Sequence, residues 1–196
     1  RHLGSNGHKV SGNGCGAMGT AVGVGPTDDA ESITAIRRAY DLGVTHFDTA
    51  HMYGWGTGEK LLGKALAPMR DNVTIATKFG LADPLWTVDS RPETIRKSVE
   101  QSLRNLGVET IDLLYQHVLD PNVPIEDVVG EMQRFVDKGQ VRYLGLSNSD
   151  AASIRRAASI APISVYQIEY SIFSRQVETL LPQLQELNIG LVAYSP

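Results

Sequence analysis

The stretch DLGVTHFDTAHMYGWGTGEK, residues 41–60, holds the features that decide the fold prediction. Gly43 is typical of a helix end, and residues 44–47 predict the short strand that follows it. Asp48 closes this strand, and Tyr53 follows on a Gly-rich loop. In parallel α/β proteins, ligands bind at the carboxyl ends of the strands. We therefore expect an acid and a phenol to lie together at a ligand site.

The rest of the chain repeats the same unit of helix, stop residue and strand. After a Gly-rich first strand, further strands are predicted at residues 44–48, 72–78, 111–117, 141–148, 165–170 and 189–195. Helical patterns separate them, over residues 28–40, 58–67, 90–106, 124–138, 151–160 and 176–187. This alternation indicates βα units and a parallel sheet.

The ends of the strands distinguish a barrel from an open sheet. Polar residues stand at or near the carboxyl ends of six strands: Asp48, Lys78, His117, Asn148, Gln167 and Tyr194. The catalytic face of a barrel collects such residues from several strands, whereas an open doubly wound sheet concentrates them at one switch point. We therefore predict an α/β fold of the (β/α)8 TIM barrel type, with residues 1–196 as one domain.

Two helix starts carry the signature of a capping box. Asp28 precedes Glu31 by three positions, and Ser90 precedes Glu93 by three positions with Pro92 between them. We expect the side chains of Asp28 and Ser90 to cap the helices that follow.

The N-terminal region is rich in glycine. Gly14, Gly16 and Gly19 form a literal G-x-G-x-x-G, but residues 20–27 intervene before the next helical pattern. A dinucleotide fingerprint opens a helix at once, so we reject a Rossmann fold and predict a Gly-rich first strand and loop. A small hairpin is predicted around residues 5–7.

Composition excludes several classes of protein. The 196 residues are 42% hydrophobic and 20% charged, which is typical of one soluble globular domain. A net charge of −4 offers no general basic surface for nucleic acid or an anionic membrane. The single cysteine, Cys15, excludes an internal disulfide framework. With no apolar leader and no spanning segment in the sequence, we expect a cytoplasmic protein.

Each candidate residue also has a structural explanation when it is considered alone. Asp48 could cap a loop, and Tyr53 could be a half-buried aromatic residue. Lys78 could be a solvated lysine, and His117 could be a core histidine whose hydrogen bonds are satisfied. A function is favoured because all four fall on one predicted face, from three neighbouring strands and an adjoining loop.

Together these four residues suit a proton transfer. A phenol with a pKa of about 10 is a weak acid unless a cation stabilises its phenolate. We expect Lys78 to do so, with Asp48 holding Lys78 charged and His117 hydrogen-bonding a substrate oxygen. Such a site protonates a developing alkoxide, which is half of a carbonyl reduction. Hydride delivery, the other half, requires a cofactor.

The sequence resembles the aldo-keto reductase family along essentially its whole length. The motifs that carry the resemblance are GVTHFDTAHMYGWGTGEKLLGKAL, VTIATKFG, SLRNLGVETIDLLYQH, VRYLGLSNSD, VYQIEYSIFSR and IGLVAYSP. The sequences of the VYQIEYSIFSR motif and of residues 120–132 are most similar to the bacterial and plant branch of the family. Members of this branch reduce varied aldehydes and ketones.

The resemblance implies a role for each matching catalytic residue. It makes Tyr53 the proton donor, Lys78 and Asp48 its support, and His117 the residue that orients the carbonyl. The substrate is then a small-molecule aldehyde or ketone, and no metal site is expected.

The resemblance also implies a nicotinamide dinucleotide, usually NADPH with NADH possible, bound without a Rossmann fold. Asp48 lies beside the nicotinamide, Ser147, Asn148 and Gln167 match the residues that hold its carboxamide, and Tyr194 matches the aromatic that stacks on its ring. Ser195 begins the stretch that approaches the pyrophosphate.

The sequence departs from the family pattern at several points. Asn13 and Cys15 stand where relatives carry apolar residues, and Trp55 and Trp86 are candidates for an apolar substrate wall. A closed barrel of eight strands takes about 250 residues, so we expect an incomplete barrel whose last βα unit is absent. The first and seventh strands would then be edges, and the residues for an adenosine 2′-phosphate would lie beyond Pro196.

Two other classes of function remain alternatives. A non-catalytic protein that binds cofactor or a partner on the same scaffold is disfavoured by the intact set of four residues. A metal-dependent hydrolase is disfavoured because His46, His51 and His117 supply too few ligands at plausible positions. The sequence does not decide the oligomeric state or the individual carbonyl substrate.

Overall fold

A parallel sheet of seven strands organises the computed structural model, which describes residues 1–4, 9–21, 28–82 and 85–196. The strands follow the chain order from one edge of the sheet to the other. They are β1 (Gly14–Gly16), β2 (His46–Asp48), β3 (Thr74–Phe79), β4 (Ile111–Gln116), β5 (Val141–Ser147), β6 (Ile163–Glu169) and β7 (Gly190–Tyr194).

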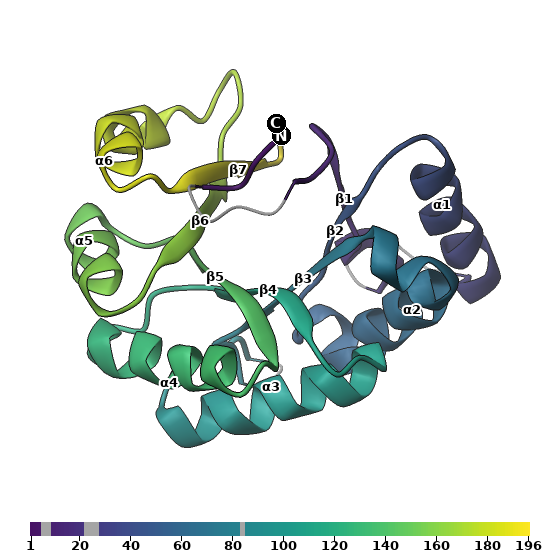
Figure 1. Cartoon of the computed structure of the whole chain (residues 1–196), viewed down its shortest axis with the longest axis horizontal. Coiled ribbons are helices and arrows are strands. Elements are labelled where there is room, and N and C mark those ends of the chain that lie inside the picture. Colours follow the sequence, from purple (N-terminus) through teal and green to yellow (C-terminus); the bar gives the residue numbers. More distant parts are fainter. Residues whose placement is uncertain (5–8, 22–27, 83–84) are drawn as a thin grey trace.

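The helices lie on the outer face of this sheet, which curls around an inner face (Figure 1). The α-helices are α1 (Asp29–Asp41), α2 (Thr57–Leu66), α3 (Pro92–Leu106), α4 (Ile125–Asp137), α5 (Ala151–Ile160) and α6 (Leu181–Glu186). Short 3-10 helices are η1 (Met18–Thr20), η2 (Tyr53–Gly56), η3 (Ala67–Asn72) and η4 (Gln176–Leu180). In the described part of the chain, no helix is long and apolar enough to cross a membrane.

The predicted α/β barrel architecture is confirmed over seven strands. All neighbouring strands pair in parallel, and within the described residues β1 pairs only with β2 and β7 only with β6. The sheet is therefore a curled, open barrel. The register brings Asp48 beside Ala76 and Ser147 beside Gln167, so the carboxyl ends of the strands meet at one mouth.

Two layers of apolar side chains fill the space on either side of the sheet. The larger one lies between the sheet and the helices, and includes Phe47, Ile75 and Leu114. The smaller one fills the inside of the barrel and is centred on Tyr115. Gly145 makes room for this ring, because a Cβ atom there would lie 2.5 Å from two of its carbons.

One predicted helix cap is confirmed and the other is wrong. Asp28 Oδ1 accepts a 2.8 Å hydrogen bond from the Glu31 amide at the start of α1. Helix α3 instead has Arg91 as its N-cap, without a side-chain hydrogen bond, and Pro92 at its first position. Ser90 is buried one residue earlier, where its amide donates to Asp120 and its hydroxyl accepts from Gln116. The hydrogen bonds of buried Ser90 with Asp120 and Gln116 thus replace the capping contact that the local sequence pattern predicts.

The N-terminal residues close the floor of the barrel. Leu3 packs on the inner apolar layer, and a Cβ atom on Gly4 would lie 2.4 Å from the Ser164 carbonyl oxygen at the start of β6. His2 and Lys9 form an antiparallel bridge on either side of the predicted hairpin, whose residues 5–7 lie outside the described residues.

The glycine motif does not form a dinucleotide fingerprint. Residues Gly14–Gly16 form β1, which leads into η1 rather than into a long helix. The next α-helix begins only at Asp29, so the rejection of a Rossmann fold is confirmed.

Candidate active site

Lys78 lies at the centre of the barrel mouth with its side chain 2% exposed. It comes from β3, and its ammonium donates to Asp48 Oδ1 and, at 2.8 Å, to the Thr49 carbonyl oxygen. A buried ammonium without such partners would be strongly unfavourable. Asp48, at the end of β2 and 16% exposed, is the acidic partner of this ammonium.

The second oxygen of Asp48 reaches across the barrel. Gln167 on β6 donates its side-chain amide to Asp48 Oδ2 at 2.9 Å. Both oxygens of the carboxylate thus accept hydrogen bonds, one from β3 and one from β6. The carboxylate has a fixed orientation, and the curl of the sheet brings together residues that are 119 positions apart.

Tyr53 approaches this pair from the turn after β2. Its helix η2 contains three successive left-handed residues, Gly54, Trp55 and Gly56, with φ of 61°, 52° and 93°. This turn places the Tyr53 ring so that Lys78 Nζ lies 5.4 Å from its centroid.

His117 completes the group from the position directly after β4. Its ring lies edge-on to Tyr53, with centroids 6.0 Å apart and an interplanar angle of 86°. The four residues predicted to act together therefore lie together, on three neighbouring strands and one turn.

The electrostatics of the phenol differ from the sequence-based expectation. Burial, and then the negative charge of Asp48, raise the pKa of Tyr53 above its ordinary value. The Lys78 ammonium, which is paired with Asp48, does not offset these two effects. Tyr53 thus keeps its proton at neutral pH.

The imidazole of His117 is neutral at neutral pH. Burial and the nearby Lys78 ammonium lower the pKa of His117 to about 4, against the opposing effect of Asp48. A neutral imidazole offers one N–H donor, which suits hydrogen bonding to an uncharged oxygen better than proton release at pH 7.

The residues predicted to hold the nicotinamide form a connected rim. Asn148, in a left-handed conformation with φ of 51°, donates to the His117 carbonyl oxygen at 3.1 Å and to Ser147 Oγ at 3.0 Å. Tyr194 on β7 donates its hydroxyl to Asn148 Oδ1 at 3.0 Å. Ser195 lies exposed beyond the end of β7.

The geometry on this mouth agrees with a family match. A model of the Aldo/keto reductase family matches residues 14–196. This chain belongs to the aldo-keto reductase family.

Individual relatives of this aldo-keto reductase agree with the assignment. The chain is 44% identical to a probable aldo-keto reductase 1 of Glycine max, over 99% of this chain and 58% of that protein. A glycerol dehydrogenase of Gluconobacter oxydans superposes with a TM-score of 0.88 at 36% identity, over 99% of this chain and 62% of the other. An aldo/keto reductase of Klebsiella pneumoniae in complex with NADP and acetate superposes with a TM-score of 0.78 at 26% identity, over 92% and 62% of the two chains. The chain therefore spans about three fifths of the length of these relatives.

The three histidines considered as metal ligands in this aldo-keto reductase come from different segments: His46 from β2, His51 from the turn after it and His117 from the position after β4. His46 is buried beside Gly14, and His51 lies 3.5 Å from Glu59 on the far side of the Tyr53 turn. In the described ranges, no group of three or more His, Cys, Asp or Glu side chains is arranged to hold a metal ion.

Two tryptophans of the reductase lie in the segments that follow β2 and β3. Trp55 is 39% exposed and Trp86 is 61% exposed, and both adopt left-handed backbone conformations. Their role as an apolar substrate wall stays a prediction.

Sequence reasoning missed three groups that support the site. The Thr49 carbonyl oxygen holds Lys78, the Tyr115 ring lies 5.8 Å from Lys78 Nζ, and Glu59 is a fully buried carboxylate behind the Tyr53 turn. A backbone oxygen leaves no signal in a sequence. The sequence signal of Glu59 was misleading, because an acidic residue in the first turn of a helix usually lies in solvent.

Proposed function

We propose that this aldo-keto reductase transfers a hydride from NAD(P)H to an aldehyde or ketone, with Tyr53 as the proton donor. The observation that carries the proposal is the meeting of Tyr53, Lys78, Asp48 and His117 at one point of the barrel mouth. In this reaction a hydride adds to the carbonyl carbon, a proton adds to the carbonyl oxygen, and NAD(P)H becomes NAD(P)⁺.

Tyr53 supplies the proton to the carbonyl oxygen. The raised pKa of Tyr53 keeps the phenol protonated until negative charge develops on the substrate. The phenolate that remains is stabilised by the Lys78 ammonium 5.4 Å from the ring centroid. Asp48 contributes by holding Lys78 charged and in place.

His117 orients the carbonyl group. Its neutral ring lies nearly perpendicular to the Tyr53 ring with centroids 6.0 Å apart, so an oxygen between the two rings receives one hydrogen bond from the imidazole and one from the phenol. Two donors aimed at the atom where charge develops provide electrostatic stabilisation of the transition state.

The rim around Asn148 fits a nicotinamide. Ser147, Asn148 and Gln167 present the hydroxyl and amide groups that a carboxamide requires, and the Tyr194 ring is 36% exposed and available for stacking. A bound nicotinamide dinucleotide supplies the hydride, which no side chain provides. We assign NADPH as the cofactor, with NADH as the alternative, and the NADP complex of the Klebsiella pneumoniae relative supports this choice.

The decisive experiment compares wild type with Tyr53→Phe for NADPH consumption on a panel of aromatic and aliphatic aldehydes. Loss of general acid catalysis lowers kcat by about 100- to 10,000-fold, while cofactor binding, followed by fluorescence quenching, stays near the wild-type value. Tyr40→Phe, which removes a phenol from the outer helix α1, is the matched control and retains activity.

Each other outcome has a defined meaning. Turnover that survives Tyr53→Phe excludes Tyr53 as the proton donor. Tight NADPH binding by wild type without turnover of any carbonyl supports a non-catalytic binding protein on this scaffold instead.

A further inference from the structure

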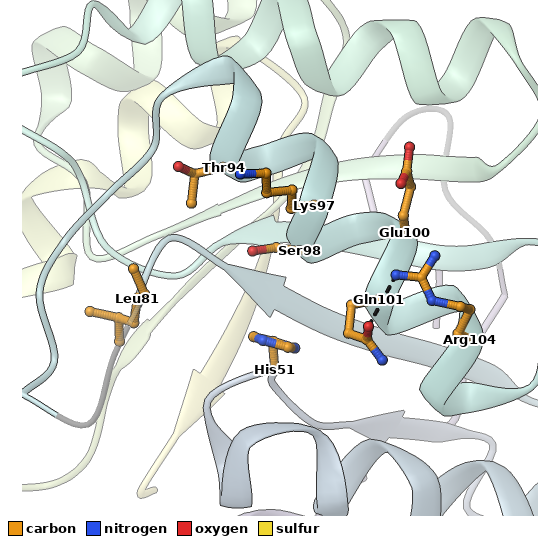
Figure 2. A pocket seen from close by; sticks show the side chains of 9 residues that line it. His51, Leu81, Thr94, Lys97, Ser98, Glu100, Gln101 and Arg104 are labelled. Atoms are coloured by element: carbon orange, nitrogen blue, oxygen red, sulfur yellow. Dashed lines mark hydrogen bonds between the residues drawn. The ribbon is translucent and has the colours of Figure 1, made fainter.

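A pocket lies beside the turn that carries Tyr53, between His51, Leu81 and helix α3. It has a volume of about 450 Å³, and His51 faces the α3 residues Ser98 and Gln101 across it (Figure 2). His51 lies three residues after the end of β2 and two residues before Tyr53, so part of the pocket wall is formed by the segment that leads into the proposed catalytic turn.

Glu59 is the buried acid beneath this wall. It belongs to the first turn of α2 and has no exposed surface. Glu59 Oε1 accepts a 2.7 Å hydrogen bond from the Thr77 hydroxyl, and Oε2 accepts a 2.8 Å hydrogen bond from Asn105. His51 Nδ1 lies 3.5 Å from the same Oε2.

The acid stays ionised despite its burial. Burial alone raises the pKa of Glu59, but its polar contacts with His51 and Asn105, followed by those with Ser102 and Thr77, together bring it below its ordinary value. A carboxylate that accepts several hydrogen bonds in a buried site is a strong and directional anchor.

A chain of hydrogen bonds from the surface fixes which way these amides point. Arg104 donates to Gln101 Oε1 at 3.0 Å, and Figure 2 shows this contact at the edge of the pocket. Gln101 Nε2 donates in turn to Asn105 Oδ1 at 2.8 Å. Because a guanidinium can only donate, each amide must present its NH₂ group to the next partner. Glu59 ends the chain and must accept.

Glu59 connects the segment that carries Lys78 with the segment that carries Tyr53. Thr77 precedes Lys78 on β3, and His51 lies on the turn that leads to Tyr53. The His51 amide donates to the Lys78 carbonyl oxygen at 3.1 Å, and the Gly56 amide donates back to the His51 carbonyl oxygen at 2.9 Å. Contacts with Glu59 therefore restrain both the strand that carries Lys78 and the turn that carries Tyr53.

Helix α3 also depends on this arrangement. A Cβ atom on Gly56 would lie 2.4 Å from the Asn105 side-chain nitrogen, so the left-handed glycine lets the turn close directly over the amide. The Tyr53 turn, strand β3 and helix α3 thus meet at the Glu59 carboxylate.

We propose that Glu59 is a positioning residue for the proton donor: its buried carboxylate fixes the Tyr53 turn relative to Lys78 through His51, Thr77 and Asn105. This inference rests on the proposed function for its effect on turnover. Its structural part, the placement of the Tyr53 ring, is independent of turnover. A misplacement of a catalytic group by about 1 Å lowers the rate up to about 100-fold.

The test compares Glu59→Gln with Glu131→Gln. Glu131 is the matched control, because it is also a buried acid, 5% exposed, but pairs with Arg96 and Arg134 on α3 and α4, away from the Tyr53 turn. Two readouts without substrate are the ¹³C resonance of the Tyr53 ring, assigned with Tyr53→Phe, and hydrogen exchange of the Gly56 amide. The kinetic readouts are kcat, KM and the NADPH dissociation constant.

We expect Glu59→Gln to shift the Tyr53 resonance, to speed exchange at Gly56, and to lower kcat by about 10- to 100-fold with KM and NADPH affinity nearly unchanged. Glu131→Gln leaves all of these at wild-type values. If Glu59→Gln fails to fold, Thr77→Val removes one hydrogen bond to Oε1 and gives a smaller change in the same direction.

Two outcomes overturn the proposal. The first is an unchanged Tyr53 resonance and unchanged Gly56 exchange in a folded Glu59→Gln protein. The second is an active wild type whose kcat survives Glu59→Gln. A wild type that reduces no carbonyl contradicts the proposed function instead, and the two substrate-free readouts then decide the positioning role alone.

Discussion

Replacing Asp48 with Asn tests whether the carboxylate holds a charged Lys78 in the barrel. Both groups that contact Asp48 are donors: the Lys78 ammonium reaches one oxygen and the Gln167 amide reaches the other. Asparagine has a single side-chain oxygen, so its NH₂ group must face a donor on one side. The substitution keeps the shape of the side chain and removes the counter-ion.

The expected loss of stability follows from the burial of the pair. Breaking a buried ion pair by removing one partner costs about 3–5 kcal/mol. The lower end applies here, because Asp48 is 16% exposed and the Thr49 carbonyl oxygen continues to accept from Lys78. About 3 kcal/mol in a domain of this size corresponds to a fall in Tm of roughly 6–12 °C.

A double-mutant cycle separates the charge pair from the rest of the site. Urea unfolding is measured for wild type, Asp48→Asn, Lys78→Met and the double variant. Because the double variant has no buried ammonium left to compensate, it is expected to be at least about 1 kcal/mol more stable than the sum of the single losses predicts. Strictly additive losses would refute the conclusion that the two residues stabilise each other.

Two further predictions concern pH and helix packing. The pKa of His117 lies near 4 when folded, below its ordinary value of about 6.5, so the unfolded chain binds this proton first. The free energy of unfolding therefore falls by up to roughly 3 kcal/mol as the pH falls from 6.5 to 4. In urea titrations, His117→Asn should flatten this dependence on pH. An equal dependence in both proteins would contradict the conclusion that His117 is neutral in the folded state. Gly63→Ala should cost about 1–3 kcal/mol because its Cβ atom would lie 2.2 Å from the Leu106 carbonyl oxygen on the neighbouring helix. Gly130→Ala, where no atom lies within 4 Å, is the control and should be neutral or stabilising by up to about 1 kcal/mol. Equal changes of stability in the two variants would contradict the role assigned to the Leu106 contact.

Local patterns predicted the elements well because most of them agree with the tertiary fold. Helix α5 begins and ends at the predicted residues 151 and 160, and Gly107 adopts the left-handed conformation expected where α3 stops. The exception is Ser90, whose capping pattern competes with hydrogen bonds to Gln116 at the end of β4 and to Asp120 in the loop after it. A loop network made by distant residues has no local signature.

The candidate active site likewise has features that the sequence predicts and features that depend on the folded structure. Asp48, Lys78 and His117 were predictable because a strand end is readable in the sequence and a barrel brings strand ends together. The raised pKa of Tyr53 was not, since it depends on how closely Asp48 approaches Lys78 and on the burial of the ring. Burial and charge distances belong to the folded state alone.

The floor of the barrel has a consequence for the order of events during synthesis. Leu3 packs on the apolar layer that includes Val165 of β6, and a Cβ atom on Gly190 of β7 would lie 2.7 Å from the Gly4 amide nitrogen, so residues 3 and 4 lie against β6 and β7. At about 5–20 residues per second, the ribosome makes residue 190 roughly ten to forty seconds after residue 4. Loop closure over such a length adds little to the equilibrium cost but slows folding. Throughout that interval Leu3 lacks part of its final apolar surroundings, and Gly4 lacks the close approach of Gly190.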